Sequence, residues 1–349
     1  MRTSYNIDDV ELLLKDITGM VEPQSTEERE KMIQSGRHYC EMLPIEYVPS
    51  SKYMQVYNEA LEKYSRPTAK AIGRLADKVI SSKGENVVLV SLARAGIPIG
   101  ILLKRYIKYK YNIDVKHYSI SIIRGRGIDT NAMNFLLANY KAEDLLFVDG
   151  WIGKGAILNE LKKDLQDFEG VSSDIAVVAD PANVTELCGT HEDILIPSSC
   201  LNSTVSGLIS RTFLRDDIIG PEDYHGAVYY GELADDDLSY DFINAIEAEF
   251  EKEVSGEEET LQGYGIDEVK ELAKEYGISD INLIKPGIGE TTRVLLRRVP
   301  WKVLIDVRYE NSPDLAHIVR LAAEKNVPIE YHELHHYKTC GIIKNLADA

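Results

Sequence analysis

Short apolar runs alternate with helical segments along the first two thirds of this chain. Residues 87–90, 145–148 and 175–179 are almost entirely apolar, which is typical of strands buried on both faces of a parallel sheet. Residues 117–123 alternate and are rich in β-prone side chains, so they predict a further strand. Because helical spacing separates these runs, the pattern predicts an α/β fold built on a parallel sheet.

Helical spacing also appears on both sides of this predicted sheet. Apolar residues recur at helical intervals through residues 8–81, which we expect to be mostly helical, with a helix start at Arg66-Pro67. The same spacing over residues 242–250 predicts an amphipathic helix that closes the first domain.

The C-terminal part repeats the α/β alternation on a smaller scale. Its pattern predicts a helix over 266–273, a strand over 281–284, a helix ending near Leu296, and then strand, helix and strand over 303–307, 315–325 and 328–331. An acidic stretch with Ser255-Gly256 separates the two parts and looks like a linker. The predicted organisation is a domain over 1–250 with a helical extension or hood at 1–84, an acidic linker at 251–261, and a small α/β/α sandwich over 262–349.

Charge limits the partners that bulk electrostatics can attract. The 349 residues carry a formal net charge of −18, so no general attraction to nucleic acid or to an anionic membrane is expected. Residues 262–349 contain 12 basic and 13 acidic side chains, so RNA binding there needs a local basic patch. Four scattered cysteines without a Cys-x-x-Cys pair predict reduced thiols. Without a signal pattern or a membrane-length apolar run, we expect a cytoplasmic protein with no membrane partner.

The most informative stretch begins where the third predicted strand ends, at Asp149. A glycine-rich loop and a predicted helix from Ala156 follow, so backbone N–H groups and the helix dipole predict an anion site. An acid beside a phosphate cradle indicates a sugar-phosphate site, although many such turns in α/β proteins bind nothing. The predicted contact residues are Asp149, Gly150, Trp151, Ile152, Gly153, Lys154, Gly155 and Ala156.

A second turn follows the first predicted strand. Arg94 offers a planar fork of donors suited to phosphate, and the alternative is a surface arginine that caps a helix. Because ligands bind at the carboxyl ends of parallel strands, we expect the two turns to form one site. The predicted contact residues of this turn are Ser91, Ala93, Arg94, Ala95 and Gly96.

These two turns resemble the ribose-phosphate and pyrophosphate loops of type I phosphoribosyltransferases, with Gly150 where that family usually has a second acid. The resemblance implies a type I phosphoribosyltransferase fold that binds phosphoribosyl pyrophosphate with Mg²⁺. Asp149 would then hold the ribose hydroxyls, residues 151–156 the 5′-phosphate, and Arg94 the diphosphate. The basic turn with Arg124 and Arg126 would match the family's mobile loop over the diphosphate, or be an ordinary solvated turn.

The chain as a whole resembles a bacterial phosphoribosyltransferase-like family of tellurium-resistance (Ter) stress operons, which has also been labelled a cysteine protease. The residues that carry this resemblance are 39–44, 149–151 and 206–207. It implies phosphoribosyl transfer to an unknown nucleophile, making a nucleoside-like metabolite in a stress response. The polar residues 37–41 would line the pocket of the hood or form a surface helix end. The nucleophile and the oligomeric state stay open, a homodimer included.

The protease label requires a thiolate paired with a base. Cys200 precedes a predicted helix, where a thiol pKa can fall, and His191 and His225 are possible bases. No spacing places either histidine beside Cys200, so a buried or capping cysteine is the preferred interpretation. Residues 332–336, His-Glu-Leu-His-His, lack the His-Glu-x-x-His spacing and predict a polar loop rather than a metal site.

The C-terminal part resembles the pelota and ribosomal kink-turn RNA-binding family. The resemblance rests on Gly-Ile-Gly-Glu-Thr-Thr-Arg at 287–293, Val-Leu-Ile-Asp-Val at 303–307 and Glu-Lys-Asn-Val-Pro at 324–328, with Gly289 in place of the usual Asn. It implies binding of structured RNA, and a structural or protein-docking module is the alternative. It would also allow a non-enzymatic RNA-binding regulator that senses a phosphoribosyl ligand. The implied RNA contacts are Lys285, Gly287, Glu290, Thr291, Arg293, Arg297 and Arg298.

Overall fold

A parallel sheet forms the centre of the first domain. The computed structural model describes residues 1–254 and 261–344, so part of the predicted 251–261 linker lies outside the described residues. The six strands follow the order β1-β4-β3-β7-β8-β9, and every neighbouring pair is parallel, as the apolar runs predicted. The strands are β1 (Glu11–Leu12), β3 (Val88–Leu92), β4 (Lys116–Ile120), β7 (Leu145–Trp151), β8 (Ile175–Ala179) and β9 (Cys188–Thr190).

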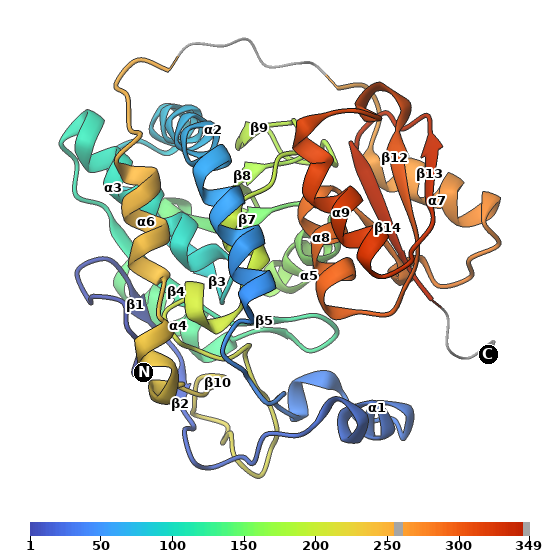
Figure 1. Ribbon diagram of the computed structural model, residues 1–349. Coiled ribbons are helices and arrows are strands. Elements are labelled where there is room, and N and C mark those ends of the chain that lie inside the picture. Colours follow the sequence, from blue (N-terminus) through green and yellow to red (C-terminus); the bar gives the residue numbers. More distant parts are fainter. Residues whose placement is uncertain (255–260, 345–349) are drawn as a thin grey trace.

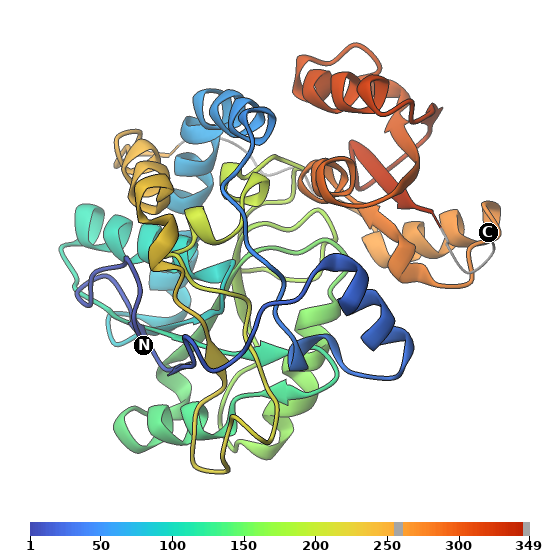
Figure 2. The ribbon, with the colours of Figure 1, turned by 60° about the horizontal axis from the view of Figure 1, so that its bottom comes forward.

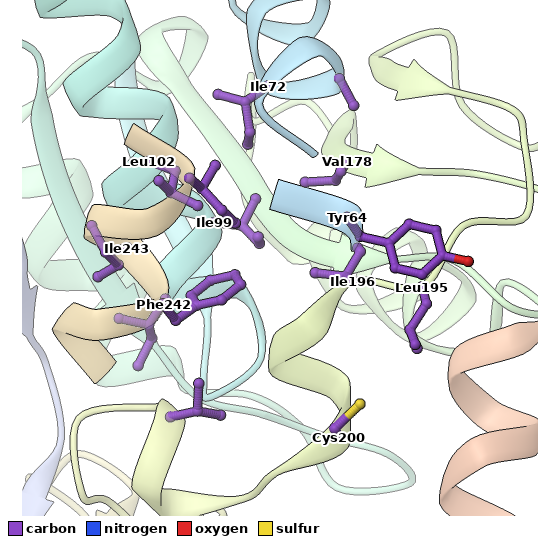
Figure 3. Packing of buried hydrophobic residues seen from close by; sticks show 14 of the residues in the cluster. Tyr64, Ile72, Ile99, Leu102, Val178, Leu195, Ile196, Cys200, Phe242 and Ile243 are labelled. Carbon is purple, nitrogen blue, oxygen red and sulfur yellow. The ribbon is translucent and has the colours of Figure 1, made fainter. Parts of the chain in front are cut away.

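Helices cover both faces of this sheet (Figure 1). The long helix α2 (Ser51–Lys83), α3 (Gly96–Tyr111) and α6 (Ser239–Glu247) pack on one face, against alternate residues such as Leu89 and Val178. Figure 3 shows Phe242 and Ile243 of α6 beside Ile99 and Leu102 of α3. The opposite face packs against α4 (Thr130–Asn139) and α5 (Ala156–Asp164). Helices on both faces explain why the runs that form β3, β7 and β8 are almost entirely apolar.

The N-terminal region differs from the predicted helical hood. Before α2 it contains the α-helix α1 (Thr26–Gln34), the 3-10 helix η1 (Tyr39–Glu41), the edge strand β1, and β2 (Lys15–Asp16), which pairs with β10 (Gly226–Ala227). Leu12 and Leu14 pack on one face of the sheet and Leu13 on the other, so the leucine run alternates as a strand does. The helical prediction holds for α1 and α2 and was wrong for the leucine segment, because pairing with β4 decides that segment and local spacing does not reveal the pairing.

The expected helix start at Arg66-Pro67 was also wrong. Helix α2 begins after Ser50, and Pro67 lies inside it. Proline removes one backbone N–H from the helix and crowds the preceding turn. Helix α2 continues because Tyr64, Thr68 and Ala71 are buried on both sides of the proline, and this packing offsets the local cost.

The C-terminal domain is an α/β/α sandwich around a four-stranded sheet of order β11-β14-β12-β13. Helices α8 and α9 share an apolar cluster with one face of the sheet, and α7 packs on the other. The sequence pattern missed β14, although it lies inside the sheet and pairs antiparallel with β11 and β12. The elements are α7 (Gly265–Glu275), β11 (Ile284–Pro286), α8 (Ile288–Arg297), β12 (Pro300–Asp306), α9 (Ala316–Glu324), β13 (Ile329–His332) and β14 (Thr339–Ile343).

The C-terminal domain docks tightly on the first domain, beside α2 and α5 (Figures 1 and 2). The apolar cluster of α2 and α3 continues into α8 and α9, so the two domains share a hydrophobic core. The buried carboxylate of Asp193 accepts hydrogen bonds from the backbone N–H groups of Ile288 and Lys338, both at 2.9 Å. None of the described helices combines the length and apolar composition that crossing a membrane requires.

Candidate functional site

Two adjoining cavities open at the carboxyl ends of the central strands, between the two domains. The smaller holds about 240 Å³ and the larger about 850 Å³, and we call the larger one the interdomain cleft. Arg94, Leu201, Asn202 and Arg293 line both, so a ligand in one reaches the wall of the other. This position agrees with the general rule for ligand sites in open α/β sheets.

Asp149 contributes the carboxylate of the smaller cavity. It ends the apolar part of β7, and its Oδ1 accepts a hydrogen bond from the Gly150 N–H at 2.7 Å. Burial raises the pKa of Asp149 to about 6, against the opposing effects of that hydrogen bond and of Arg293. The carboxyl group can therefore change its protonation state close to neutral pH.

The 91–96 turn supplies only part of its predicted contacts. Ala93, Arg94 and Ala95 line the smaller cavity. Ser91 instead lies 2.6 Å from His117 Nε2 inside the protein. Gly96 packs against the backbone of Val148, where a Cβ would lie 2.4 Å from the carbonyl oxygen. Gly96 thus allows α3 to approach β7, which is a packing role.

The 150–156 loop serves largely as a docking surface for the C-terminal domain. Trp151 lines the smaller cavity, whereas the Gly153 carbonyl accepts a hydrogen bond from the Tyr337 hydroxyl at 2.7 Å. Lys154 donates to two carbonyls of the C-terminal domain, at residues 281 and 284, and burial lowers its pKa to about 8. The remaining predicted contacts Gly150, Ile152, Gly155 and Ala156 belong to the end of β7 and the start of α5.

The basic turn at 124–127 lies apart from both cavities. It connects two short strands, β5 (Ile122–Ile123) and β6 (Gly127–Ile128). The Arg124 guanidinium donates to Asn282 Oδ1 at 3.0 Å, and Arg126 forms a 2.6 Å ion pair with Glu41. The polar cluster at residues 37–41 therefore packs against this turn and lines neither cavity.

Basic side chains from both domains surround the interdomain cleft. They come from α1, the 91–96 turn and the 207–212 segment of the first domain, and from β11 and α8 of the C-terminal domain. They are Arg29, Arg94, Arg211, Lys285, Arg293, Arg297 and Arg298.

Five of the implied RNA contacts line this cleft: Lys285, Glu290, Arg293, Arg297 and Arg298. The other two do not. Thr291 is fully buried, and Gly287 backs onto Asp193, with a φ of +93° that favours glycine. The backbone at Gly287 therefore shapes the start of α8 rather than the cleft surface.

Neutral oxygen atoms hold the guanidinium groups of Arg94, Arg211 and Arg297 in place, whereas Arg293 pairs with the Glu290 carboxylate. Arg297 donates to Asn202 Oδ1 at 2.6 Å and to the Cys200 carbonyl at 2.8 Å. Arg211 donates to the carbonyls of Tyr39 and Met42, and Arg94 to that of Ile209. Burial lowers the pKa of Arg211 and of Arg297 to about 10, so both stay cationic at neutral pH. Such partners fix the arginines without neutralising them, and the cleft stays positive.

All four cysteines are buried. Burial raises the pKa of Cys200 to about 12, which opposes thiolate formation. The two histidines considered as its bases have other contacts. His225 Nδ1 lies 2.8 Å from Ser121 Oγ, and His191 contacts Cys188. Cys200 is thus a buried thiol, as its sequence context indicated.

Two cysteine–histidine contacts were not predicted from the sequence. His38 Nδ1 lies 3.0 Å from Cys40 Sγ, and His191 Nε2 lies 3.4 Å from Cys188 Sγ. In the second pair His191 Nδ1 is 2.9 Å from the Asp180 carbonyl, which orients the ring. The short spacings His-x-Cys and Cys-x-x-His were the available signal. Burial raises the pKa of Cys40, and nearby Arg126 opposes that shift.

The His-Glu-Leu-His-His run does not form a metal centre. His332 ends β13, and the backbone N–H groups of His335 and His336 donate to the Glu268 carboxylate from the following loop. Within residues 1–254 and 261–344, no three His, Cys, Asp or Glu side chains gather closely enough to hold a metal ion.

Comparison with known families decides the classification. The family model described as "tellurite-like stress resistance cysteine protease StiP" matches residues 3–247. The chain belongs to the StiP family. It is 34% identical over 364 residues to the cysteine protease StiP of Acinetobacter baylyi (strain ATCC 33305 / BD413 / ADP1), covering 98% of this chain and 94% of that protein. A PELOTA RNA-binding domain model matches residues 263–345.

This membership corrects the expected activity. Phosphoribosyl transfer, and with it the transferase class, was wrong, because the family is described as a stress-resistance cysteine protease. The tellurium-resistance context and the pelota resemblance agree with the family findings. A strand, an acid and a glycine loop recur wherever a parallel strand turns into a helix, so that motif alone does not fix the chemistry. The expected Mg²⁺ was tied to the phosphoribosyl ligand and stays an untested prediction, as does the homodimer.

Solved phosphoribosyltransferases match only part of the chain. A hypoxanthine-guanine phosphoribosyltransferase from Bacillus anthracis str. 'Ames Ancestor' is 20% identical, with 36% of this chain and 71% of that chain covered and a TM-score of 0.26. A hypoxanthine-guanine-xanthine phosphoribosyltransferase is 16% identical, with 35% and 68% covered and a TM-score of 0.24. Scores this low carry no argument about fold or function.

Proposed function

We propose that this StiP-family protein binds RNA in the interdomain cleft. The observation that carries the proposal is the ring of seven basic side chains from both domains around one cavity of about 850 Å³. The PELOTA match supports it, because three of these side chains belong to that domain at α8: Arg293 and Arg297 in the helix and Arg298 at its C-cap. Arginine recognises phosphate through paired donors, and the neutral oxygen partners of Arg297 leave its charge available.

The net charge of −18 makes this positive cleft a local exception. Long-range attraction of RNA is therefore weak, and binding depends on close phosphate contacts inside the cleft. Each phosphate contact releases counterions, so RNA affinity falls as the salt concentration rises.

Fluorescence anisotropy of the full chain with labelled RNA at 50 and 200 mM salt tests the proposal. Arg298, an exposed residue at the end of α8, is the first position to change. Arg298→Ala should weaken binding and reduce the slope of log K against log salt by about one. Lys270→Ala on α7 is the matched control, because Lys270 lies outside the cleft and pairs with Asp267. RNA that fails to bind the wild-type chain at 50 mM salt would overturn the proposal.

We propose cysteine-dependent hydrolysis of peptides as a second function, in line with the family description. The observation that favours it is the 3.0 Å contact between His38 Nδ1 and Cys40 Sγ. In this reaction His38 takes the thiol proton while the sulfur attacks the peptide carbonyl carbon. The C–N bond breaks as the proton passes to the leaving amine, and water then hydrolyses the thioester.

The environment of Cys40 sets the conditions for this reaction. Arg126 and Arg211 both act to lower the pKa of the Cys40 thiol, although burial has the larger, opposite effect. Because the thiol is buried and contacts the Leu214 carbonyl, a substrate reaches it only after the chain near Leu214 moves.

A fluorogenic peptide library tests this second function with single serine variants. Cys40→Ser should abolish hydrolysis, and Cys200→Ser should leave it unchanged. If only Cys188→Ser loses activity, the nucleophile is Cys188 with His191 beside it, and the assignment to Cys40 is refuted. A wild-type chain without thiol-dependent hydrolysis of any library peptide would refute the function itself.

A further inference from the structure

We infer that the interdomain cleft is built for single-stranded RNA rather than for a folded duplex. The inference rests on the proposed RNA binding and specifies the form of RNA that the cleft takes. It follows from the different chemistry of the two walls of the cleft. The C-terminal domain contributes a basic wall. The first domain contributes a wall in which apolar and aromatic residues of the 44–53 segment lie beside Glu46, with Arg29, Arg94 and Arg211 also lining that side.

The basic wall consists of Lys285 on β11, Arg293 and Arg297 on α8, and Arg298 at the C-cap of that helix. Arg293 and Arg297 lie on one helix face, at a spacing of four, and Arg298 follows in extended backbone. Arg293 has a 3.2 Å ion pair with Glu290, whereas Arg297 is fixed by neutral oxygen atoms. This wall presents a row of phosphate donors along the helix.

The aromatic wall is the 44–50 segment that connects η1 (Tyr39–Glu41) to α2, together with Tyr53. Figure 2 shows the chain leading into α2 on the side that faces the C-terminal domain. Tyr47 is 70% exposed, and Val48 is also exposed, which is unusual for large apolar side chains at a cavity. Pro49 fixes its own φ and restricts the backbone of Val48, the residue before it.

The Tyr53 hydroxyl donates to the Leu296 carbonyl at 2.8 Å and ties the aromatic wall to α8. Tyr47 is more exposed, and its ring is the side chain of the wall best placed for a ligand. An exposed aromatic ring opposite a row of arginines is the arrangement that binds nucleotides by stacking and by phosphate contact together.

Stacking on Tyr47 requires a base whose face is free. In a duplex each base face is covered by its neighbours, whereas a single strand can place a base on a protein ring. The phosphates of the same strand then lie toward Arg293, Arg297 and Arg298. Charge complementarity selects a polyanion over a neutral peptide, and the aromatic wall selects an unpaired strand over a duplex.

The test compares three labelled RNAs on the full chain by fluorescence anisotropy: a 12-nucleotide uridine strand, a 12-base-pair duplex and a kink-turn RNA. We expect the single strand to bind most tightly at the same salt concentration. Tyr47→Ala should weaken single-strand binding about 5- to 100-fold, because one base–aromatic stack is lost. Tyr47→Phe should retain binding, since the ring remains.

Tyr331→Ala is the matched control, because Tyr331 is 47% exposed on β13 and lies outside the cleft lining. Preference for the kink-turn or the duplex, or an unchanged affinity in Tyr47→Ala, would overturn the single-strand inference while leaving RNA binding intact. Absence of binding to all three RNAs would overturn both. Binding of an acidic peptide, with no binding of RNA, would reassign the cleft to a protein partner and also overturn both.

Discussion

Asp149 illustrates how burial sets the chemistry of a single residue in this protein. The strand β7 carries its carboxyl group into the interior, where one backbone N–H and the distant charge of Arg293 only partly compensate for lost hydration. Its pKa therefore rises to about 6. A group of this kind costs folding free energy when ionised, and it makes stability depend on pH near neutrality.

Asp149→Asn should remove this dependence. The folded-state pKa exceeds the ordinary value of 3.8, so the folded chain binds more protons between these two pH values. The wild-type chain thus gains stability as pH falls from above 6 toward 4, by up to about 3 kcal/mol. Urea unfolding gives the free energy of unfolding of both chains at pH 8 and at pH 5. The variant should gain more stability relative to wild type at pH 8 than at pH 5. An equal difference at both pH values would contradict the interpretation.

Among the secondary-structure elements, the close approach of helix α3 to strand β7 positions the site. Helix α3 starts at Gly96 directly against the backbone of β7, and this brings the 91–96 turn beside Asp149. The neighbouring glycine of the other turn, Gly150, has more room, since the nearest atom to a Cβ there lies at 3.7 Å. Two glycines of the same site thus have different structural requirements.

Gly96→Ala should destabilise the protein by about 1–3 kcal/mol, because the new methyl group would lie 2.4 Å from the Val148 carbonyl oxygen and α3 must shift. Gly150→Ala is the control and should change the unfolding midpoint little. The two midpoints can be compared by thermal unfolding followed by circular dichroism. Similar midpoints for both variants would contradict this prediction, because α3 would then accommodate the methyl group without loss of stability.

For the whole molecule, the docking of two domains creates the cleft. The Asp193 carboxylate of the first domain accepts two backbone hydrogen bonds from the C-terminal domain, one of them from the first turn of α8. This carboxylate also lies at the positive end of the α8 dipole. A rigid cleft depends on these contacts and on the apolar cluster that both domains share.

Asp193→Ala should therefore loosen the docking. It leaves two buried N–H groups without their partner, at a cost of about 1–3 kcal/mol each. Hydrogen exchange should accelerate at Ile288 and Lys338 while the central strands of the first domain stay protected. Asp267→Ala, on the exposed side of α7, is the control. Unchanged exchange at Ile288 would mean that the apolar cluster alone holds the domains together.

Local patterns in the sequence were sufficient to predict the layered α/β architecture and its central strands. The apolar runs that became β3, β7 and β8 are continuous because both faces are buried, and that signal is local. The same holds for α6 and α7, whose spacing predicted them correctly. The sequence also indicated that Asp149 and Arg94 line one site, because parallel strands end at one edge of the sheet.

Features that depend on contacts between distant segments became visible only in the folded chain. Glu11 and Leu12 form a strand because β4 lies beside them, and β14 enters a sheet that its own pattern did not reveal. The 150–156 loop matched an anion-binding pattern, yet Tyr337 and the 281–284 segment occupy much of it. The basic cleft exists only because α8 faces Arg94 and Arg211 across the domain boundary. Local spacing records which residues are buried, but it does not record which distant surface buries them.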